Sequence, residues 1–280
     1  MTKPPPPDSA QVFDRKLLRL RRARAAASFA DHGFLFDEVA IRLCERLEEV
    51  TRQFPLALEL GGREGVLARH LPEKAAIDTL IRCDTSPATV RPDEGGISLK
   101  LAGDLEALPF SEGEFDLIIS LLELHWVNDL PGLLLQVNHA LKADGLFLAA
   151  FLGGSTLYEL RESWMHAEVA LKGGAHPRVS PFVDLRDAGA LLQRAGFALP
   201  VADLDSITVE YSDPLTLMRD LRGMGESHAG HARARSFTSR QTLLEAARRY
   251  QQDYALPSGR VPATFEVIFL TAWAPSAEQP

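Results

Sequence analysis

Residues 56–65, which read LALELGGREG, decide the predicted fold. The apolar run 56–60 has the length and composition of a short buried strand. The glycines that follow allow a tight turn, and the pattern over 64–71 is compatible with a helix. A strand, a glycine turn and a helix in this order begin a strand–helix repeat. The stretch therefore predicts an α/β fold with the turn at one edge of a sheet.

Further apolar runs continue this pattern along the chain. The additional predicted strands are 75–83, 97–102, 115–121, 146–151 and 264–273. Between the fourth and fifth strands, apolar residues at helical spacing predict a helix over 130–141. Near-continuous apolar strands are typical of a parallel sheet covered by helices on both faces. We therefore expect a doubly wound sheet that binds its ligand beyond the carboxyl ends of the strands.

Carboxylates stand where the first three predicted strands end. Glu59 lies at the end of the first strand, Asp84 ends the second, and Asp104 with Leu105 follows the third. A carboxylate in the place of Asp84 can accept both hydroxyls of a ribose. Asp104 beside Leu105 suits an exocyclic amine next to an apolar wall. A single strand-end Asp is often only a helix cap, but the three together predict an adenosine site.

The loop after the first strand discriminates between two kinds of adenosine cofactor. A dinucleotide site normally has the pattern G-x-G-x-x-G and holds a pyrophosphate at a helix N-terminus. Here the loop is GGREG and follows Glu59, whose charge would repel a pyrophosphate but attract the ammonium of a methionine moiety. Gly61 and Gly65 let the backbone approach the ligand. The sequence therefore favours S-adenosylmethionine.

Composition excludes several other classes of protein. The 280 residues carry a formal net charge of -8, which argues against a general nucleic-acid binder. No apolar run is long enough to cross a bilayer. Cys44 and Cys83 are too few for a disulfide framework or a cysteine zinc site, and no other metal motif is present, so we expect no metal. We expect a cytoplasmic globular protein.

The chain divides into four predicted segments. They are a disordered proline-rich N-terminus over 1–12, a helical segment over 13–53, a catalytic domain over 54–274 and a loose tail over 275–280. Insertions after residue 151 are expected to cover the cleft.

The arginine-rich stretch 15–24 is interpreted as a solvated basic helix face, with Leu17, Leu18 and Leu20 packed on the core. Organelle targeting or binding of an anionic partner is the alternative.

His125 is the candidate catalytic residue. It follows the fourth predicted strand, at the level where a substrate would meet the methyl group, and can act as a base or orient the substrate. Alternatively, it only fills the loop beside Trp126. Farther along, the glycine-containing stretches 173–178 and 222–228 are expected either to close over or line the cleft, or to be ordinary turns.

Several motifs resemble a known family. ELGGREG, Asp84, GDLEALPF, FDLIISLLELHWVND and LKADGLFLAAF resemble, in order and spacing, the motifs of class I S-adenosylmethionine-dependent methyltransferases of the type 11 group. FPLALEL, LHWVNDLP, GGSTLYELR, LRGMGES and VPATFEV are similar to segments of the bacterial relatives of NADH:ubiquinone oxidoreductase complex assembly factor 5. The first set covers about residues 54–151, and the second extends the resemblance along most of the chain.

The resemblance implies a seven-stranded, mostly parallel Rossmann-like sheet with helices on both faces. It places Asp84 at the ribose and Arg63 where the family usually has a glycine. Arg63 can fold outward, pair with the carboxylate of the ligand, or weaken cofactor binding. The other residues that the resemblance assigns to the cofactor are Glu59, Gly61 and Gly65 at the methionine end, Asp104 and Leu105 at the adenine, and Leu121.

The resemblance also implies a function. We expect an S-adenosylmethionine-dependent methyltransferase that acts on a small molecule or a protein side chain and is linked to assembly of respiratory complex I. Two alternatives remain open: hydroxylation of an arginine in a complex I subunit, and a non-catalytic assembly chaperone with a degraded cofactor loop. The expected partner is the acceptor, for which a complex I subunit is one option, and not a nucleic acid.

Overall fold

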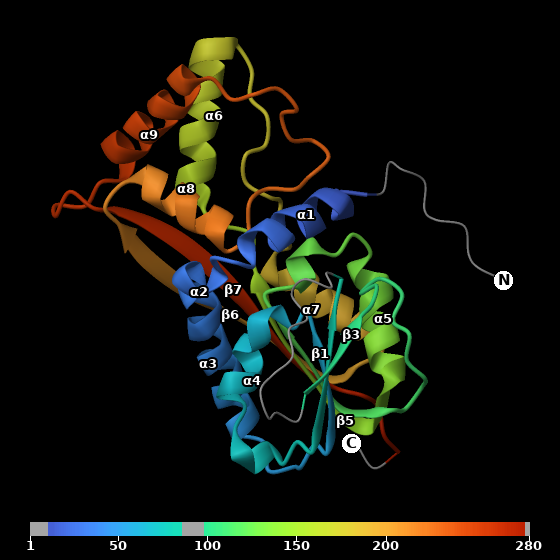
Figure 1. Cartoon of the computed structure of the whole chain (residues 1–280). Coiled ribbons are helices and arrows are strands. Elements are labelled where there is room, and N and C mark those ends of the chain that lie inside the picture. The colour runs from blue at the N-terminus through green and yellow to red at the C-terminus, as the bar shows by residue number, and fades with distance from the viewer. Residues whose placement is uncertain (1–10, 86–97, 278–280) are drawn as a thin grey trace.

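One twisted sheet organises the computed structural model, which describes residues 11–85 and 98–277 (Figure 1). Within these residues, seven strands lie in the order β3-β2-β1-β4-β5-β7-β6. Their bounds are Leu56–Leu60 for β1, Thr79–Asp84 for β2, Ser98–Ala102 for β3, Phe115–Leu121 for β4, Leu141–Leu152 for β5, Ala198–Tyr211 for β6 and Val261–Trp273 for β7. Strands β1 to β5 pair in parallel, whereas β7 runs antiparallel to both β5 and β6. The predicted class I architecture is confirmed.

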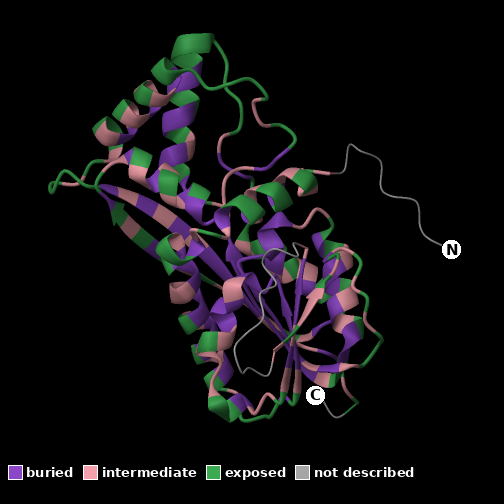
Figure 2. Ribbon diagram, viewed as in Figure 1, coloured by how far each residue is buried: buried purple, intermediate pink, exposed green. Residues whose placement is uncertain are grey.

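Helices cover both faces of the sheet. They are α1 (Arg15–Ala25), α2 (Phe29–His32), α3 (Phe34–Glu48), α4 (Val66–His70), α5 (Leu130–Ala140), α6 (Tyr158–Lys172), α7 (Leu185–Arg194), α8 (Pro214–Gly223) and α9 (Arg240–Tyr254). One apolar core contains Phe36 of α3, and a second core, on the other face, contains Leu133 of α5 and Leu192 of α7. Figure 2 shows the buried strands between helices whose outer sides are exposed.

The site is positioned by the way the chain crosses the sheet. Strand β1 pairs with β2 on one side and β4 on the other, so the strand order reverses there. In such sheets the crevice for ligands opens at this reversal, beyond the carboxyl ends of the strands. Helix α1 lies across this end, while α6, α8 and α9 gather at the far end of β6 and β7 (Figure 1). Among the residues described, no helix is both long and apolar enough to cross a membrane.

Several details differ from the expectations. The second strand begins at Thr79, because residues 73–75 form a 3-10 turn and Ala76 has a φ of 47°. The last strand begins at Val261, and its antiparallel neighbour β6 was not located from the sequence. Residues 1–10, 86–97 and 278–280 lie outside the described part of the chain, so the disorder expected at the two ends stays a prediction.

The interpretation of α1 as a solvated basic face with its leucines packed on the core was wrong for Leu20 and Arg22. Leu18 is buried, but Leu20 is 47% exposed, whereas Arg22 is only 1% exposed. The helix therefore turns an arginine, and not its third leucine, toward the sheet. An arginine is tolerated there only because a carboxylate meets it, as described below.

Candidate functional site

The carboxyl ends of β1, β2 and β4 bring most of the predicted cofactor residues together. Glu59 lies beside Arg82 in the β1–β2 pairing, and the Gly61 amide donates to the carbonyl of Cys83 at 2.8 Å. Asp84 ends β2 with 1% exposure, and Leu121 ends β4 with 3% exposure. Parallel strands end at one edge, so these four positions lie at the same edge of the sheet.

Glu59 and Arg82 form an ion pair inside the protein. Arg82 Nε donates to Glu59 Oε2 at 3.1 Å, and Arg82 Nη2 donates to the carbonyl of Gly62. Both side chains are almost fully buried. Gly65, with a φ of +71°, lies so close that a Cβ there would be 3.3 Å from Arg82 Nη1. Arg82 therefore contacts the glycine loop and neutralises Glu59, the carboxylate predicted for the methionine end.

A second buried ion pair joins α1 to the end of β4. Arg22 Nη1 donates to Glu123 Oε1 at 2.7 Å, and the two side chains are 0% and 3% exposed. Gly61, with a φ of +82°, packs against this glutamate, since a Cβ there would lie 2.6 Å from Glu123 Cγ. Burial raises the pKa of Glu123, while the charge of Arg22 opposes that rise. Only glycine fits at position 61 beside this pair.

This second pair leaves polar atoms unused. Within the described residues, Arg22 Nε and Nη2 and Glu123 Oε2 are buried without a hydrogen-bond partner. Such orphaned atoms carry a desolvation penalty unless a ligand or water satisfies them. Of this pair, Glu123 lines the strand-end cavity described below, whereas Arg22 is 1% exposed and does not.

Arg63 turns away from the crevice. Its Nη1 lies 2.6 Å from Glu226 Oε1, its Nη2 donates to the carbonyl of Met224, and its guanidinium lies 4.8 Å from the ring centre of Phe36. The side chain is 3% exposed and lines neither cavity described below. The structure thus shows Arg63 as an internal ion-pair partner, folded neither outward nor toward the predicted ligand.

Glu226 also holds the candidate catalytic histidine. His125 Nε2 lies 3.0 Å from Glu226 Oε2, and Trp126 Nε1 donates to the same oxygen at 2.7 Å. The amide of Leu152 donates to His125 Nδ1 at 3.4 Å, which assigns the ring proton to Nε2. Burial lowers the pKa of His125, although Glu226 opposes this. The ring is therefore neutral at neutral pH, with both nitrogens engaged.

Two cavities flank Trp126. The first, which we call the strand-end cavity, has a volume of about 510 Å³ and is lined by α1 and the loops after β2, β3 and β4. Asp104 and Leu105, which the resemblance assigns to the adenine, line it, and so does Glu123. Asp104 accepts from the amide of Glu106 at 2.9 Å and pairs with Arg15 of α1. Glu59, Gly61, Gly65, Asp84 and Leu121 lie outside the lining of this cavity.

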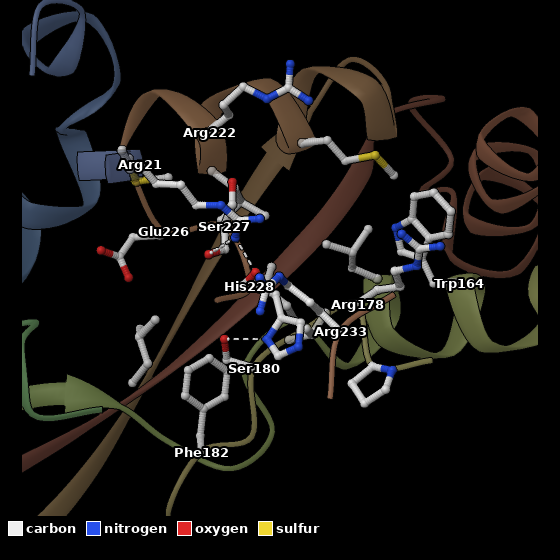
Figure 3. A pocket seen from close by; sticks show the side chains of 18 of the residues that line it. Arg21, Trp164, Arg178, Ser180, Phe182, Arg222, Glu226, Ser227, His228 and Arg233 are labelled. Carbon is white, nitrogen blue, oxygen red and sulfur yellow. Dashed lines mark hydrogen bonds between the residues drawn. The ribbon is translucent and has the colours of Figure 1, made fainter. Parts of the chain in front are cut away.

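The second cavity, which we call the inner cavity, has a volume of about 250 Å³ and is drawn in Figure 3. Its walls are largely apolar, with Leu160 and Trp164 of α6 and Phe265 of β7 among them. Several basic side chains also line it: Arg21, Arg178, Arg222, His228 and Arg233. The segments that contain GGAHPR and RGMGESH both contribute, so both predicted cleft loops do line a cavity, although Gly173 also caps α6.

Sequence reasoning missed the partners of these charges. Arg22 was read as part of a solvated run, and the roles of Arg82 and Glu226 depend on contacts far apart in the chain. Glu123 carried one usable signal, because it is an acidic residue two positions after the predicted strand 115–121. In residues 11–85 and 98–277, no group of three or more acidic, His or Cys side chains could hold a metal ion.

Comparisons with known proteins agree with this geometry. The family model for a methyltransferase domain matches residues 58–149. The chain is 41% identical to arginine-hydroxylase NDUFAF5, mitochondrial, of Danio rerio over 96% of this chain and 84% of that protein. It is 35% identical to malonyl-[acyl-carrier protein] O-methyltransferase of Halorhodospira halophila over 95% of this chain and 90% of that protein.

Solved structures support the same fold. The YcgJ protein of Bacillus subtilis superposes with a TM-score of 0.56 at 14% identity, over 85% of this chain and 99% of that one. At this identity the likeness concerns the fold, and the family follows from the two relatives above. The chain belongs to the S-adenosylmethionine-dependent methyltransferases, in the family that includes proteins named arginine-hydroxylase NDUFAF5 and malonyl-[acyl-carrier protein] O-methyltransferase.

Proposed function

We propose that this chain binds S-adenosylmethionine at the strand ends and transfers its methyl group to an acceptor in the inner cavity. One observation carries the proposal: the strand-end cavity and the inner cavity share Trp126 as a common wall. Methyl transfer needs chiefly the alignment of a nucleophile with the methyl group, and two adjoining cavities supply separate sites for the two reactants.

The unused atoms of the buried pair fit the methionine end of the cofactor. A methionine moiety carries a carboxylate and an ammonium. The free Nε and Nη2 of Arg22 can donate to the carboxylate, and the free Oε2 of Glu123 can accept from the ammonium. Each orphaned atom would then gain a partner of the appropriate kind. This assignment adds Arg22 and Glu123 to the predicted set.

The remaining cofactor residues keep their predicted roles as part of this proposal. Asp84 would hold the ribose, and Asp104 with Leu105 would contact the adenine in the strand-end cavity. Gly61 and Gly65 would let the loop backbone approach the ligand, with Glu59 behind it and Leu121 at the adjacent strand end. When bound, S-adenosylmethionine supplies an electrophilic methyl group on a sulfonium.

The chain's own residues prepare the acceptor side. His125 and Trp126 are both anchored on Glu226, so their positions beside the shared wall are fixed before any ligand arrives. His125 remains the proposed base or orienting group. Its side chain is fully buried, lines neither cavity and has both ring nitrogens engaged, which favours the orienting role. We propose that segment 13–53 and the insertions after residue 151 cover the cleft of domain 54–274 and exclude water from it.

Hydroxylation of an arginine is the second candidate. It is favoured because the relative of Danio rerio named arginine-hydroxylase matches 96% of this chain at 41% identity, above the 35% of the Halorhodospira halophila methyltransferase. The proposed link to complex I rests on this relationship and on the resemblance to assembly factor 5. A cytoplasmic location and the absence of a nucleic-acid partner also stay proposals. A non-catalytic chaperone is the third possibility.

Substitution of Arg22 tests the cofactor assignment. Arg22→Lys keeps the charge next to Glu123 but removes the Nε donor and the planar fork, so we expect S-adenosylhomocysteine to bind about 10–100-fold more weakly in calorimetry. Arg24→Lys on the same helix is the matched control, because Arg24 is exposed, whereas Arg22 is the arginine that pairs with Glu123. Equal affinities for the two variants and the unmodified chain, in folded proteins, would contradict the assignment.

The reaction is tested by mass spectrometry. Complex I subunits from a strain that lacks this gene are compared with those from the parent strain. Loss of a mass equal to one methylene group supports protein methylation, and loss of one oxygen supports hydroxylation. If the subunits are unchanged, the purified chain is assayed with labelled S-adenosylmethionine and a small-molecule extract. Transfer of label supports a small acceptor, whereas no transfer supports the chaperone.

A further inference from the structure

A strongly basic cavity lies between α1 and α8, next to the inner cavity. We call it the vestibule; its volume is about 590 Å³. Five arginines from three parts of the chain line it, together with small residues and one histidine: Arg21, Arg24, Arg178, Arg219 and Arg222, with Ala25, Ser28, His32, Gly223, Ser227 and Thr238. No acidic side chain is among the residues that line it.

Two of the basic groups in the vestibule are neutralised inside the protein. Arg178 Nε donates to Glu168 Oε1 at 3.0 Å, and its Nη1 donates to the hydroxyl of Thr238 at 2.9 Å. His32 Nδ1 lies 2.8 Å from Asp220 Oδ1. These groups are therefore already satisfied and build the wall of the vestibule.

The other four arginines have no such compensation. Arg21 Nη1 donates to the backbone carbonyl of Ser227 at 2.9 Å, which leaves its charge unmatched. In the part of the chain that the structure describes, Arg24, Arg219 and Arg222 likewise form no ion pair with a carboxylate. The whole chain has 38 acidic against 30 basic residues, so unmatched arginines gathered around one cavity are not a consequence of composition. They create a local positive potential that favours an anion.

The vestibule continues into the inner cavity. Arg21, Arg178, Arg222 and Ser227 line both, and Figure 3 shows Arg21, Arg178 and Arg233 around His228. A basic entrance therefore leads to the apolar walls formed by α6 and β7.

His228 adds a donor at this junction. Its Nδ1 accepts from the amide of Gly230 at 3.4 Å and lies 3.1 Å from Ser180 Oγ, so the ring proton is assigned to Nε2. His228 Nε2 is buried and has no partner among the described residues. Burial, with the charges of Arg21, Arg233 and Arg178, lowers the pKa of His228 to about 4. At neutral pH the ring is therefore an uncharged N–H donor.

We propose that the vestibule and the inner cavity together bind an anionic amphiphile. Its phosphate or carboxylate head lies among Arg21, Arg24, Arg219 and Arg222, and its apolar or uncharged chain occupies the inner cavity. This proposal deepens the proposed function. Binding of the amphiphile does not depend on that function, but its role as the acceptor does. Because the inner cavity reaches Trp126, the group that is modified lies at the end of the molecule opposite the anionic head.

Binding of simple amphiphiles to the full chain tests the proposal. Octyl phosphate, octanoate, octanol and octyltrimethylammonium are titrated by calorimetry, each below its micelle concentration. We expect the two anions to bind at least about tenfold more tightly than octanol, and the cation to bind most weakly. The ratio between octyl phosphate and octanoate shows which head group the vestibule prefers. Octanol and the cation binding as tightly as the anions would overturn the proposal.

A double variant localises the head group. R24A/R219A removes two exposed arginines from the vestibule that lie outside the inner cavity, so folding should be retained. We expect octyl phosphate affinity to fall about tenfold or more, with octanol affinity unchanged. R186A/R194A on α7 is the matched control, since both residues are exposed and outside the vestibule. Equal effects of the two double variants would place the anion elsewhere and overturn the assignment.

A parallel titration separates this proposal from the proposed function. R24A/R219A is expected to bind S-adenosylhomocysteine with unchanged affinity, because neither residue lines the strand-end cavity. If octyl phosphate binds as expected while the unmodified chain does not bind S-adenosylhomocysteine, the proposed anion site in the vestibule is supported and the proposed cofactor site is contradicted. If S-adenosylhomocysteine binds and octyl phosphate does not, the anion site in the vestibule is contradicted and the cofactor site is supported.

Discussion

The strand ends and the vestibule differ in how their charged side chains are paired. At the strand ends, buried arginines and carboxylates are arranged as pairs, such as Arg22 with Glu123 and Arg82 with Glu59. In the vestibule, four of the five arginines have no carboxylate partner among the described residues, and only Arg178 pairs with one, Glu168. The first arrangement holds a site in shape before a ligand arrives. The second arrangement leaves positive charges that an anionic ligand can neutralise.

This difference makes separate predictions for the two sides. Substitutions among the paired charges should reduce the free energy of unfolding as well as ligand affinity, because they orphan a buried partner. Substitutions of the unpaired arginines should affect ligand affinity alone. The predictions below are ordered by the size of the expected effect.

Loss of Glu226 should have the largest effect. This buried carboxylate accepts from Arg63 and Trp126 and contacts His125, so Glu226→Ala leaves a buried cation unpaired. We expect the free energy of unfolding in urea to fall by about 3–5 kcal/mol. Glu210→Ala is the control, because Glu210 pairs with Arg260 at the surface and should cost less than about 1 kcal/mol. Similar losses of unfolding free energy in both variants would contradict the expected difference between buried and surface ion pairs.

The same residue makes the protein sensitive to acid. Burial by itself disfavours the charged form, but the hydrogen bond to His125 and the charges of Arg63 and Arg22 outweigh it and lower the pKa of Glu226 to about 2. The unfolded chain, with a pKa near 4.5, therefore takes up the proton first as pH falls. The stabilisation is complete above about pH 5, and about 2–3 kcal/mol of it is lost toward pH 2.

Unfolding curves measured between pH 7 and pH 3 check this expectation. His125 acts in the same direction, since its pKa in the folded chain lies below the ordinary value of 6.5 and the unfolded chain protonates first. Glu226→Gln cannot titrate and should flatten the slope below pH 5. An equal slope in this variant would show that other groups govern acid unfolding.

Asp84 should have an intermediate effect that is confined to the cofactor. Asp84→Ala removes a charged acceptor from the predicted ribose position, so S-adenosylhomocysteine should bind more weakly by about 1–3 kcal/mol in calorimetry. Asp116→Ala is the control, because Asp116 lies on β4 far from its carboxyl end and pairs with Lys142. Unchanged affinity in folded Asp84→Ala would remove Asp84 from the site.

Asp104 should have the smallest effect. It is partly exposed, with 45% of its side chain accessible, and its ion pair with Arg15 lies at the surface. Asp104→Ala should therefore change the free energy of unfolding by less than about 1 kcal/mol. Loss of one acceptor for the adenine amine should weaken S-adenosylhomocysteine by about 0.5–1.5 kcal/mol. A larger loss of affinity than in Asp84→Ala would reverse the ranking of the two carboxylates.

The sequence predicted the parts of this fold that local pattern controls. The apolar runs at β1 and β4 and the helix α5 were found close to their observed bounds, and Asp129 caps α5 by accepting from Gly132. Strand β6 was missed because it lies at an edge and most of its residues are only partly buried or exposed, so no continuous apolar run marks it.

The candidate site was predicted unevenly for a related reason. Strand-end residues such as Asp84 can be recognised in the sequence, because a polar residue there ends an apolar run. The contacts of Arg22 with Glu123 and of Arg63 with Glu226 span 101 and 163 residues of sequence. No local pattern encodes such distances, so an arginine in a basic run could not be distinguished from its solvated neighbours. The vestibule was missed for the same reason, since it combines residues of α1 and α8.

The most direct test of the central claim is calorimetric titration of the purified, folded chain with S-adenosylmethionine and S-adenosylhomocysteine. We predict binding of both in the micromolar range with one site per chain, because we propose that the strand-end cavity holds the adenosine and that the partnerless atoms of Arg22 and Glu123 hold the methionine moiety. Absence of binding to either compound, in a protein whose fold is verified by circular dichroism, would contradict the cofactor site and favour the chaperone or chemistry with another cofactor.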